Sequence, residues 1–179
     1  MATPATNYCL YSEAFDTSVA PSTTGGWQQL AGATVTADAT TDPFGATTTA
    51  DQVNFPNVAN GERIEQWSTI SPANGETWTF SCWLKGSGTM DIYITTEAYS
   101  GGYTQTNITL SGTWTRYSAT VTFAAPTGRL RVDINRNSGE TATAATVWGA
   151  QAEFGSAATD YNVTTSAASA GYPFGQAVF

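Results

Sequence analysis

The sequence of 179 residues has no histidine, only two cysteines and few charged residues, and each scarcity excludes a class of site. Without histidine the chain lacks the commonest general base and the commonest metal ligand, so a Ser-His-Asp triad is excluded. Cys9 and Cys82 are too far apart for a Cys-x-x-Cys motif or a zinc site. The alternating pattern around Cys82 predicts a buried free thiol, and a Cys9–Cys82 disulfide is the alternative.

Positive charge is also scarce, because six Lys and Arg residues stand against fourteen Asp and Glu residues and give a net charge of −8. Nucleic acids and anionic membranes are both bound through basic side chains, so we expect neither as a partner. The opening residues, MATPATNY, lack the basic and apolar regions of a secretory signal peptide. No stretch approaches the ~20 apolar residues of a membrane helix. We therefore expect synthesis in the cytoplasm, with a final location outside the cell left open.

Apolar residues recur at every second position in many short segments, which is the period of a strand with one buried face. The clearest predicted strands are Thr77–Lys85, Thr89–Glu97, Trp114–Phe123 and Gly128–Asn135, and weaker ones are Thr34–Ala39, Ala50–Phe55, Arg63–Ile70, Thr106–Leu110 and Thr146–Phe154. Turn-forming Gly, Pro, Asn and Asp residues separate them. No window shows a sustained helical period. The sequence predicts an all-β fold, a jelly-roll-type antiparallel β-sandwich.

We expect one sandwich domain over residues 1–162, followed by an extended tail over residues 163–179. The tail begins with small Ser and Ala residues and ends in an aromatic, apolar segment. Its candidate partner-binding residues are Tyr172, Phe174, Val178 and Phe179. Such a tail either packs on its own sandwich or docks as an arm on a neighbouring subunit or another partner.

Five segments, taken in order, resemble a β-sandwich domain of bacteriophage tail and virion proteins. They are NYCLYSEAF at Asn7–Phe15, the Thr- and Ala-rich Ala33–Ala50, GETWTFSCWLK at Gly75–Lys85, Trp114–Phe123, and VWGAQAEF at Val147–Phe154. The resemblance extends from about residue 7 to residue 162. It implies a jelly roll like those of carbohydrate-binding modules, which occurs in phage adhesins, tail fibres and capsid-decorating proteins.

The resemblance implies a structural protein on the virion exterior, made in the host cytoplasm. Because only a short tail accompanies the domain, it favours a capsid decoration or cement protein that stabilises the assembled head. The expected partners are the major capsid protein or other virion proteins. A homo-oligomer is expected, and a trimer would suit the threefold positions of a capsid. The alternative is a tail-associated adhesin or carbohydrate-binding module that recognises cell-surface glycans.

Aromatic side chains outside the apolar rows are candidates for a glycan platform, because a ring stacks on the C–H face of a sugar. The predicted platform consists of Trp83, Tyr93, Tyr99 and Tyr103. The structural alternative is that Trp83, like Trp67, fills the second face of a sheet or lies beneath a terminal segment. Trp78, Tyr117 and Trp148 are predicted core residues.

No combination of residues in the sequence predicts catalysis. The acidic residues fall mostly at turns or on outward strand positions, as solvated charges do, so we expect no enzyme. No cofactor is expected. The resemblance leaves a structural calcium ion open, and Asp38, Asp42 and Asp160 are the candidates by their position near strand ends.

Overall fold

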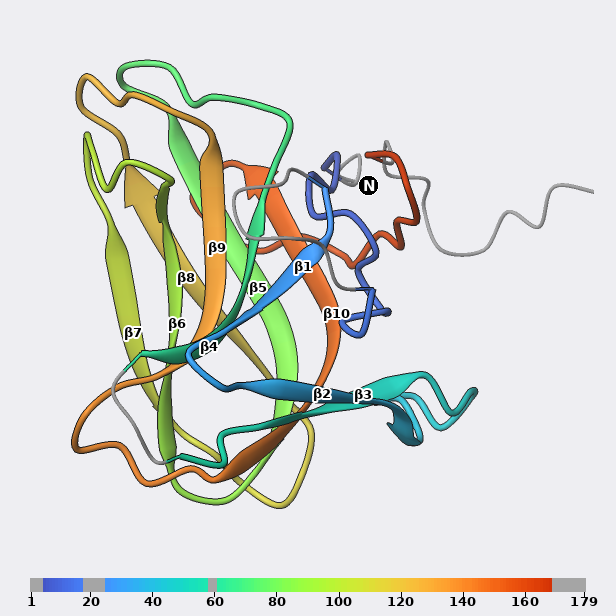
Figure 1. The fold of residues 1–179 in the computed structure, drawn as a ribbon. Helices are drawn as coiled ribbons and strands as arrows, with labels where there is room; N and C mark the ends of the chain where they lie inside the picture. Colours follow the sequence, from blue (N-terminus) through green and yellow to red (C-terminus); the bar gives the residue numbers. More distant parts are fainter. Residues whose placement is uncertain (1–4, 18–24, 58–60, 169–179) are drawn as a thin grey trace, which may run out of the picture.

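The computed structural model describes residues 5–17, 25–57 and 61–168, which form two β-sheets packed face to face (Figure 1). The ten strands are β1 (Trp27–Leu30), β2 (Thr34–Thr40), β3 (Ala50–Asn54), β4 (Glu62–Trp67), β5 (Thr77–Gly86), β6 (Thr89–Thr96), β7 (Thr104–Thr109), β8 (Thr115–Thr122), β9 (Leu130–Arg136) and β10 (Ala144–Phe154). Within these described ranges, nothing forms a helix long and apolar enough to cross a membrane.

The two sheets have five strands each. The first sheet has the order β1-β4-β9-β6-β7, and the second has the order β2-β3-β10-β5-β8. All eight pairs of neighbouring strands are antiparallel. Most neighbours in a sheet are not consecutive in sequence, so the chain crosses repeatedly from one sheet to the other. The predicted all-β jelly-roll sandwich is confirmed.

The predicted strands all occur, with ends displaced by at most three residues. β1 is the strand that the apolar period does not predict. Its sequence, WQQL, places two glutamines side by side instead of alternating polar and apolar residues. It forms because all four of its residues pair with β4, so a neighbouring strand decides its conformation and not its own pattern.

Alternate residues of the strands fill the core between the sheets, as the apolar rows predict. The central strands contribute Phe80, Cys82, Leu84, Met90, Ile92, Ile94, Val132 and Ile134. Cys9 and Cys82 both lie in this core as free thiols, which confirms the prediction for Cys82 and excludes the disulfide. Burial raises the pKa of the Cys82 thiol to about 12 and raises the pKa of Cys9 still further, so both stay protonated at neutral pH.

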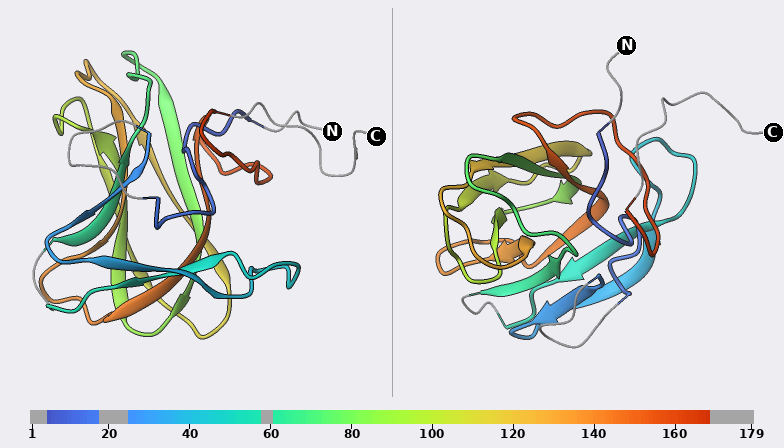
Figure 2. Two further views of the ribbon diagram at one scale, coloured as in Figure 1. Left: turned by 45° about the vertical axis from the view of Figure 1, so that its right-hand side comes forward. Right: turned by 90° about the horizontal axis from the view of Figure 1, so that it is seen from above.

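The two ends of the described chain complete the second sheet. β3 pairs with only the first part of β10. Beyond it the N-terminal segment (residues 5–17) runs beside β10, where Ala150 N donates to Ser12 O at 2.9 Å. The C-terminal segment (residues 155–168) lies next to it in turn, since Ser12 N donates to Thr164 O at 3.2 Å. Figure 2 shows the two segments side by side.

Candidate functional site

Four aromatic side chains meet on the outer face of the second sheet. This aromatic cluster consists of Phe44 from the loop between β2 and β3, Trp83 from β5, Trp148 from β10, and Tyr161 from the C-terminal segment. Trp83 and Trp148 are register partners, and their ring centroids are 5.4 Å apart. The Trp148 and Tyr161 centroids are 4.7 Å apart, and the Phe44 and Trp148 centroids are 5.6 Å apart.

Two local features position the aromatic cluster. β10 is bulged at Gly149, whose φ of 64° brings the backbone against Trp83, and a Cβ there would lie 3.0 Å from the indole ring. In the loop between β2 and β3, the Asp42 carboxylate accepts hydrogen bonds from Phe44 N at 2.7 Å and from Thr47 Oγ1 at 2.8 Å. These bonds close the loop in the way that aspartate closes turns. Phe44 is thereby held outward, with 64% of its surface exposed.

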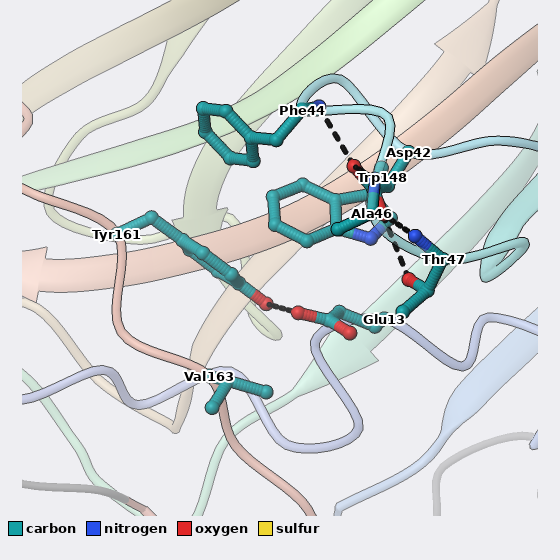
Figure 3. A pocket seen from close by; sticks show the side chains of 8 residues that line it. All are labelled: Glu13, Asp42, Phe44, Ala46, Thr47, Trp148, Tyr161 and Val163. Atoms are coloured by element: carbon teal, nitrogen blue, oxygen red, sulfur yellow. Dashed lines mark hydrogen bonds between the residues drawn. The ribbon is translucent and has the colours of Figure 1, made fainter. Parts of the chain in front are cut away.

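Phe44 stands between two cavities. The first cavity, of about 300 Å³, is drawn in Figure 3 and is lined by Glu13, Asp42, Phe44, Ala46, Thr47, Trp148, Tyr161 and Val163. The second cavity, of about 280 Å³, is lined by Phe44, Trp83, Arg116, Asp160 and Tyr161. The two differ in charge, because the first is lined by two carboxyl groups and the second by one carboxyl group and one guanidinium.

The charged groups of the two cavities interact with the rings. The Tyr161 hydroxyl donates to Glu13 Oε1 at 3.1 Å. Burial raises the pKa of Glu13, the hydrogen bond from Tyr161 opposes this, and the charge of Asp42 adds to it. Burial also acts to raise the pKa of Asp42, but the hydrogen bonds of its loop outweigh it and lower that pKa. In the second cavity, Arg116 Cζ lies 4.4 Å from the centroid of the Trp83 ring.

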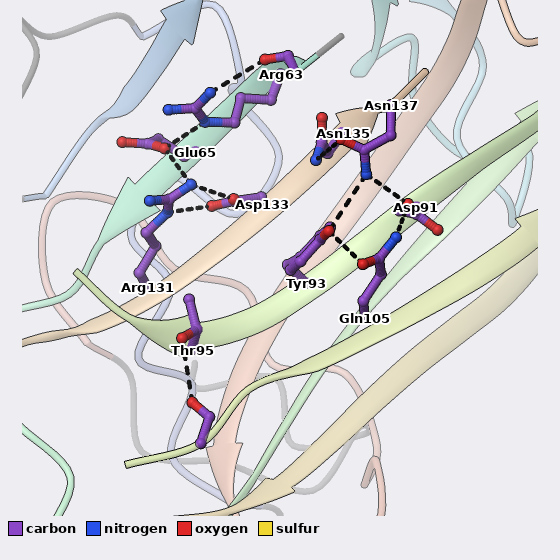
Figure 4. Close-up of polar contacts among 12 residues, drawn as sticks. Arg63, Glu65, Asp91, Tyr93, Thr95, Gln105, Arg131, Asp133, Asn135 and Asn137 are labelled. Carbon is purple, nitrogen blue, oxygen red and sulfur yellow. Dashed lines mark hydrogen bonds and ion pairs between the residues drawn. The ribbon is translucent and has the colours of Figure 1, made fainter. Parts of the chain in front are cut away.

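The outer face of the first sheet is polar. Register partners on neighbouring strands point to the same side, so their side chains form rows across the sheet. One row runs Gln28, Glu65, Asp133, Tyr93 and Gln105, the next runs Arg63, Asn135, Asp91 and Asn107, and a third contains Trp67, Arg131 and Thr95. We call this surface the polar face, and Figure 4 shows most of it.

Charged side chains on the polar face are held in ion pairs. Arg131 Nε donates to Asp133 Oδ1 at 2.7 Å, and another nitrogen of Arg131 lies 2.8 Å from Glu65 Oε2. Arg63 Nε lies 2.7 Å from the same Glu65 oxygen. Burial raises the pKa of Asp133, while Arg131 acts to lower it. Two cations and two carboxylates thus offset one another on this part of the surface.

A second network surrounds Tyr93. The Tyr93 hydroxyl donates to Gln105, whose amide donates to Asp91. Asn137 Nδ2 donates to the same Asp91 carboxylate at 2.7 Å. Glu140 Oε1 accepts a hydrogen bond from Asn107 Nδ2 at 3.0 Å, and burial together with the neighbouring Asp91 carboxyl group raises the pKa of Glu140 to about 7.

Two buried polar atoms of the polar face have no hydrogen-bond partner within the described ranges. They are Oδ1 of Asn135, in the middle row, and Nε1 of Trp67, in the third row. One is an acceptor and the other a donor. A buried polar group without a partner costs free energy, so both atoms lower the stability of this face.

The structure divides the predicted platform between the two sheets. Tyr93 lies at the centre of the polar face, whereas Trp83 lies in the aromatic cluster on the opposite side of the sandwich. Tyr99 and Tyr103 are exposed in the loop between β6 and β7, and the Tyr99 ring centroid lies 4.6 Å from Cζ of Arg131. The predicted tail residues lie outside the described residues; they are Tyr172, Phe174, Val178 and Phe179.

The three aromatic residues predicted to lie in the core differ in where the structure places them. Trp78 is buried in the main core. Tyr117 is half-buried and packs against that core from its edge. Trp148 is buried as predicted, but it belongs to the aromatic cluster and not to the core between the sheets. Phe44 and Tyr161 were not among the predicted site residues, although the Asp-Pro-Phe-Gly turn signal marks Phe44 as a ring at a loop tip.

The three aspartates considered for calcium are separate in the structure. Asp42 closes its loop, Asp160 lines the second cavity, and Asp38 is exposed on β2. In the part of the chain that the structure describes, no three acidic or cysteine side chains converge. A structural calcium ion stays a prediction.

No protein-family profile and no curated protein matches this sequence. Among solved structures, the enzymatically active domain of tailspike protein 4 from bacteriophage CBA120 is similar, with a TM-score of 0.59 and 14% identity over 83% of this chain. The CBM22-1–CBM22-2 tandem domain of Xyn10C from Paenibacillus barcinonensis has a TM-score of 0.56 and 16% sequence identity. The match covers 89% of this chain and 48% of the tandem domain. The CBM22-1 xylan-binding domain of Xyn10C has a TM-score of 0.54 and 15% sequence identity. The match covers 88% of this chain and 100% of that domain.

At these identities the likeness shows the fold alone. The fold is the β-sandwich of carbohydrate-binding modules and of a phage tailspike domain, which confirms the fold that the sequence resemblance implies. This chain spans only about a fifth (21%) of the tailspike chain.

Proposed function

We propose that this protein binds glycans without altering them chemically, and that the polar face is its binding surface. The observation that carries the proposal is the position of Tyr93, a half-buried ring in the middle of rows of hydrogen-bonding side chains. A sugar ring presents an apolar C–H face that stacks on such a ring and a rim of hydroxyl groups that bond to amides and carboxylates.

The polar face is organised before any ligand arrives. Tyr93, Gln105 and Asp91 are linked in a chain of hydrogen bonds on three adjacent positions of rigid strands. Side chains that are already fixed lose little conformational freedom on binding, and this raises the affinity for a ligand that fits.

The distribution of charge on the polar face suits a neutral sugar. The groups most open to solvent are the amides of Gln105 and Asn107, whereas Arg131 and Asp133 are buried in their ion pair. A buried pair is disturbed at high cost if a charged ligand competes for one partner. An uncharged glycan requires no such exchange.

The fold neighbours support a glycan as the ligand. One of them is a xylan-binding domain, and another belongs to a phage tailspike protein. They favour the adhesin or carbohydrate-binding alternative over capsid decoration. The decoration hypothesis, its capsid and oligomer partners, and a place on the virion exterior stay predictions; the tail arm to which decoration was assigned lies outside the described residues.

Binding without catalysis is supported by the carboxyl groups of the polar face. The pair most like a catalytic one is Asp91 and Glu140, because the pKa of Glu140 is raised to about 7. Nδ2 of Asn107 donates to Asp91 Oδ1 at 3.2 Å and to Glu140 Oε1 at 3.0 Å, so an amide lies between these two carboxyl groups, where a glycosidase leaves room for the scissile bond. Glu65 and Asp133 are engaged by Arg131.

A glycan array followed by isothermal titration calorimetry tests the proposal. The wild-type protein should select one class of neutral oligosaccharide, and Tyr93→Ala should weaken that binding about tenfold or more through loss of stacking. Gln105→Ala should weaken it less, because one polar contact is lost. Phe154→Ala is the matched control, since Phe154 is an exposed ring (58%) outside both surfaces. No binding to any glycan, or an equal loss in Phe154→Ala, would contradict the proposal.

A further inference from the structure

Most of the cationic side chains of this protein lie over aromatic rings. Four of its six Lys and Arg side chains do so, in the pairs Lys85–Trp114, Arg116–Trp83, Arg129–Trp67 and Arg131–Tyr99, at 4.4 to 4.8 Å from the ring centroids. Such contacts are favourable because the face of an aromatic ring is electron-rich. Among the described residues, the rings of the first cavity receive no such cation.

The first cavity has the geometry of an aromatic box. The planes of Phe44 and Trp148 are inclined at 82°, and those of Trp148 and Tyr161 at 57°. Rings inclined in this way line different sides of one space, as Figure 3 shows for the three rings around the first cavity. A compact cation in that space would contact more than one ring face at once.

Two carboxyl groups make the first cavity electronegative. Glu13 lies beside Tyr161, and Asp42 lies at the base of the loop that carries Phe44 (Figure 3). The net charge of −8 adds a long-range attraction for cations. No Lys or Arg side chain lines this cavity, in contrast to the second cavity, where Arg116 lies over Trp83.

The lining also indicates the kind of cation. Most of it is ring and methyl surface from Phe44, Trp148, Tyr161, Ala46 and Val163. A primary ammonium group holds its water strongly and loses it at high cost in such a place, whereas an alkylated ammonium group is weakly hydrated. A volume of about 300 Å³ is at the small end for ligand sites and suits a headgroup.

We propose that the first cavity is a second ligand site, which binds the trimethylammonium group of a choline-type ligand against the rings of Phe44, Trp148 and Tyr161 that line it, with Glu13 and Asp42 as counter-charges. This site is on the second sheet, whereas the polar face is on the first, so neither proposal depends on the other. Aromatic boxes with nearby carboxylates are a general solution for quaternary ammonium groups.

Titration with choline, followed by calorimetry and by tryptophan fluorescence, tests the site. The matched control ligand is 3,3-dimethylbutan-1-ol, which has the shape of choline without its charge. Choline should bind at least about tenfold more tightly than this alcohol, because the cation–π and carboxylate attractions are lost with the charge. Equal binding of the two, or binding of neither, would overturn the proposal.

Substitutions of residues that line the first cavity test whether choline binds there. Phe44→Ala should weaken choline binding about tenfold, and Phe44→Tyr should retain it, because the second variant keeps the ring. Phe44 is 64% exposed, so neither change disturbs the core. Glu13→Gln should weaken binding severalfold by removing one counter-charge. Choline binding that survives Phe44→Ala unchanged would exclude this cavity, and Phe154→Ala serves again as the exposed-ring control.

Two carriers of the same chemistry can be told apart in the same assay. A phosphocholine-substituted polysaccharide represents a cell-surface polymer, and phosphatidylcholine vesicles represent a lipid headgroup. Retention of either by the wild-type protein but not by Phe44→Ala supports the proposal and identifies the source. Retention that is equal in the two proteins contradicts it.

Discussion

Arg131 shows at the scale of a single residue how the polar face keeps charge away from water. Its side chain is only 4% exposed, and its guanidinium contacts both Asp133 and Glu65. Arg129 is a basic residue two positions earlier, with a partner of its own in Glu97, but its side chain is 30% exposed. The two arginines therefore differ clearly in burial.

We expect Arg131→Met to lower the free energy of unfolding by about 3 kcal/mol, because it leaves the buried Asp133 carboxylate without its cation and leaves Glu65 with Arg63 alone. Arg129→Met should change it by about 1 kcal/mol or less, since an exposed ion pair is screened by solvent. Urea denaturation of the two variants measures both values. Similar losses in the two variants would show that burial of the Arg131 network contributes little to stability.

Glu140 gives the polar face a dependence on pH. Its pKa is raised from 4.5 to about 7, first by burial and then by Asp91, so the folded state holds this proton more tightly than the unfolded chain does. Its contribution to the free energy of unfolding is therefore fully present below about pH 4.5 and is lost as the pH rises through about 7.

The prediction for Glu140 compares the wild type with Glu140→Gln, which cannot titrate. Between about pH 5 and about pH 8 the free energy of unfolding of the wild type should fall relative to that of the variant. Urea denaturation at several pH values measures the difference. Carboxyl groups that do not interact with Glu140 titrate equally in both proteins and cancel in this difference, whereas the interaction with Asp91 is part of what it measures. Parallel curves would mean that Glu140 ionises as it does in the unfolded chain.

At the scale of the elements, the bulge in β10 connects backbone conformation to the aromatic cluster. Gly149 has a φ of 64°, and a Cβ there would lie 3.0 Å from Trp83. Gly75 has a φ of 83°, but a Cβ there would meet nothing within 4 Å. Both positions thus have a positive φ that favours glycine, but only at Gly149 would an added Cβ contact an aromatic ring.

We expect Gly75→Ala to lower the free energy of unfolding by about 1 kcal/mol, from the positive φ alone. Gly149→Ala should lower it by about 1 to 3 kcal/mol more, because the added methyl group pushes against Trp83. Denaturation followed by tryptophan fluorescence reports both the stability and any change in the cluster. An equal loss in the free energy of unfolding for the two variants would mean that β10 shifts away from Trp83 at no cost in free energy.

The strands were predictable because most of them carry their own pattern. Leu130, Val132 and Ile134 alternate with Arg131 and Asp133 along β9, and this alternation identifies the strand and its core side, although the charged residues on the other side are buried as well. β1 could not be predicted, because its two adjacent glutamines are organised by β4 and not by a pattern of their own. The bulge at Gly149 was equally hidden, since a single glycine in a strand does not say which ring will lie against it.

At the scale of the whole molecule, the sites were less predictable than the strands. Period two identifies Trp83 and Tyr93 as outward-facing, but it does not say that they belong to different sheets. The first cavity is built from four separate segments of the chain, which contribute Glu13, Phe44, Trp148 and Tyr161. Their meeting depends on how the terminal segments lie along β10, and that is a property of the tertiary fold.

Asn7 holds the two terminal segments to β10. It is fully buried, and its Nδ2 donates to Ala150 O at 2.9 Å and to Asn162 O at 2.8 Å. Its Oδ1 accepts from Cys9 N at 3.0 Å and from Ala152 N at 3.1 Å. One side chain thus joins the beginning of the described chain, the last strand and the C-terminal segment.

We expect Asn7→Ala to lower the free energy of unfolding by roughly 2 to 4 kcal/mol, because it leaves several buried backbone groups without a partner. Asn74→Ala is the matched control, since Asn74 is exposed and accepts one hydrogen bond, from Ala125 N, so about 1 kcal/mol or less should be lost. Urea denaturation compares the two variants. Equal losses would mean that water replaces the bonds of Asn7 without cost.

The same variant separates the two proposed sites. Glu13 and Tyr161 reach the first cavity from the segments that Asn7 holds, whereas the rows around Tyr93 belong to the first sheet. Asn7→Ala should therefore weaken choline binding severalfold and leave glycan binding within about twofold of wild type, both measured by calorimetry where the variant is fully folded. Loss of both ligands together would show that the two sheets respond as one unit and that the sites are coupled through the core.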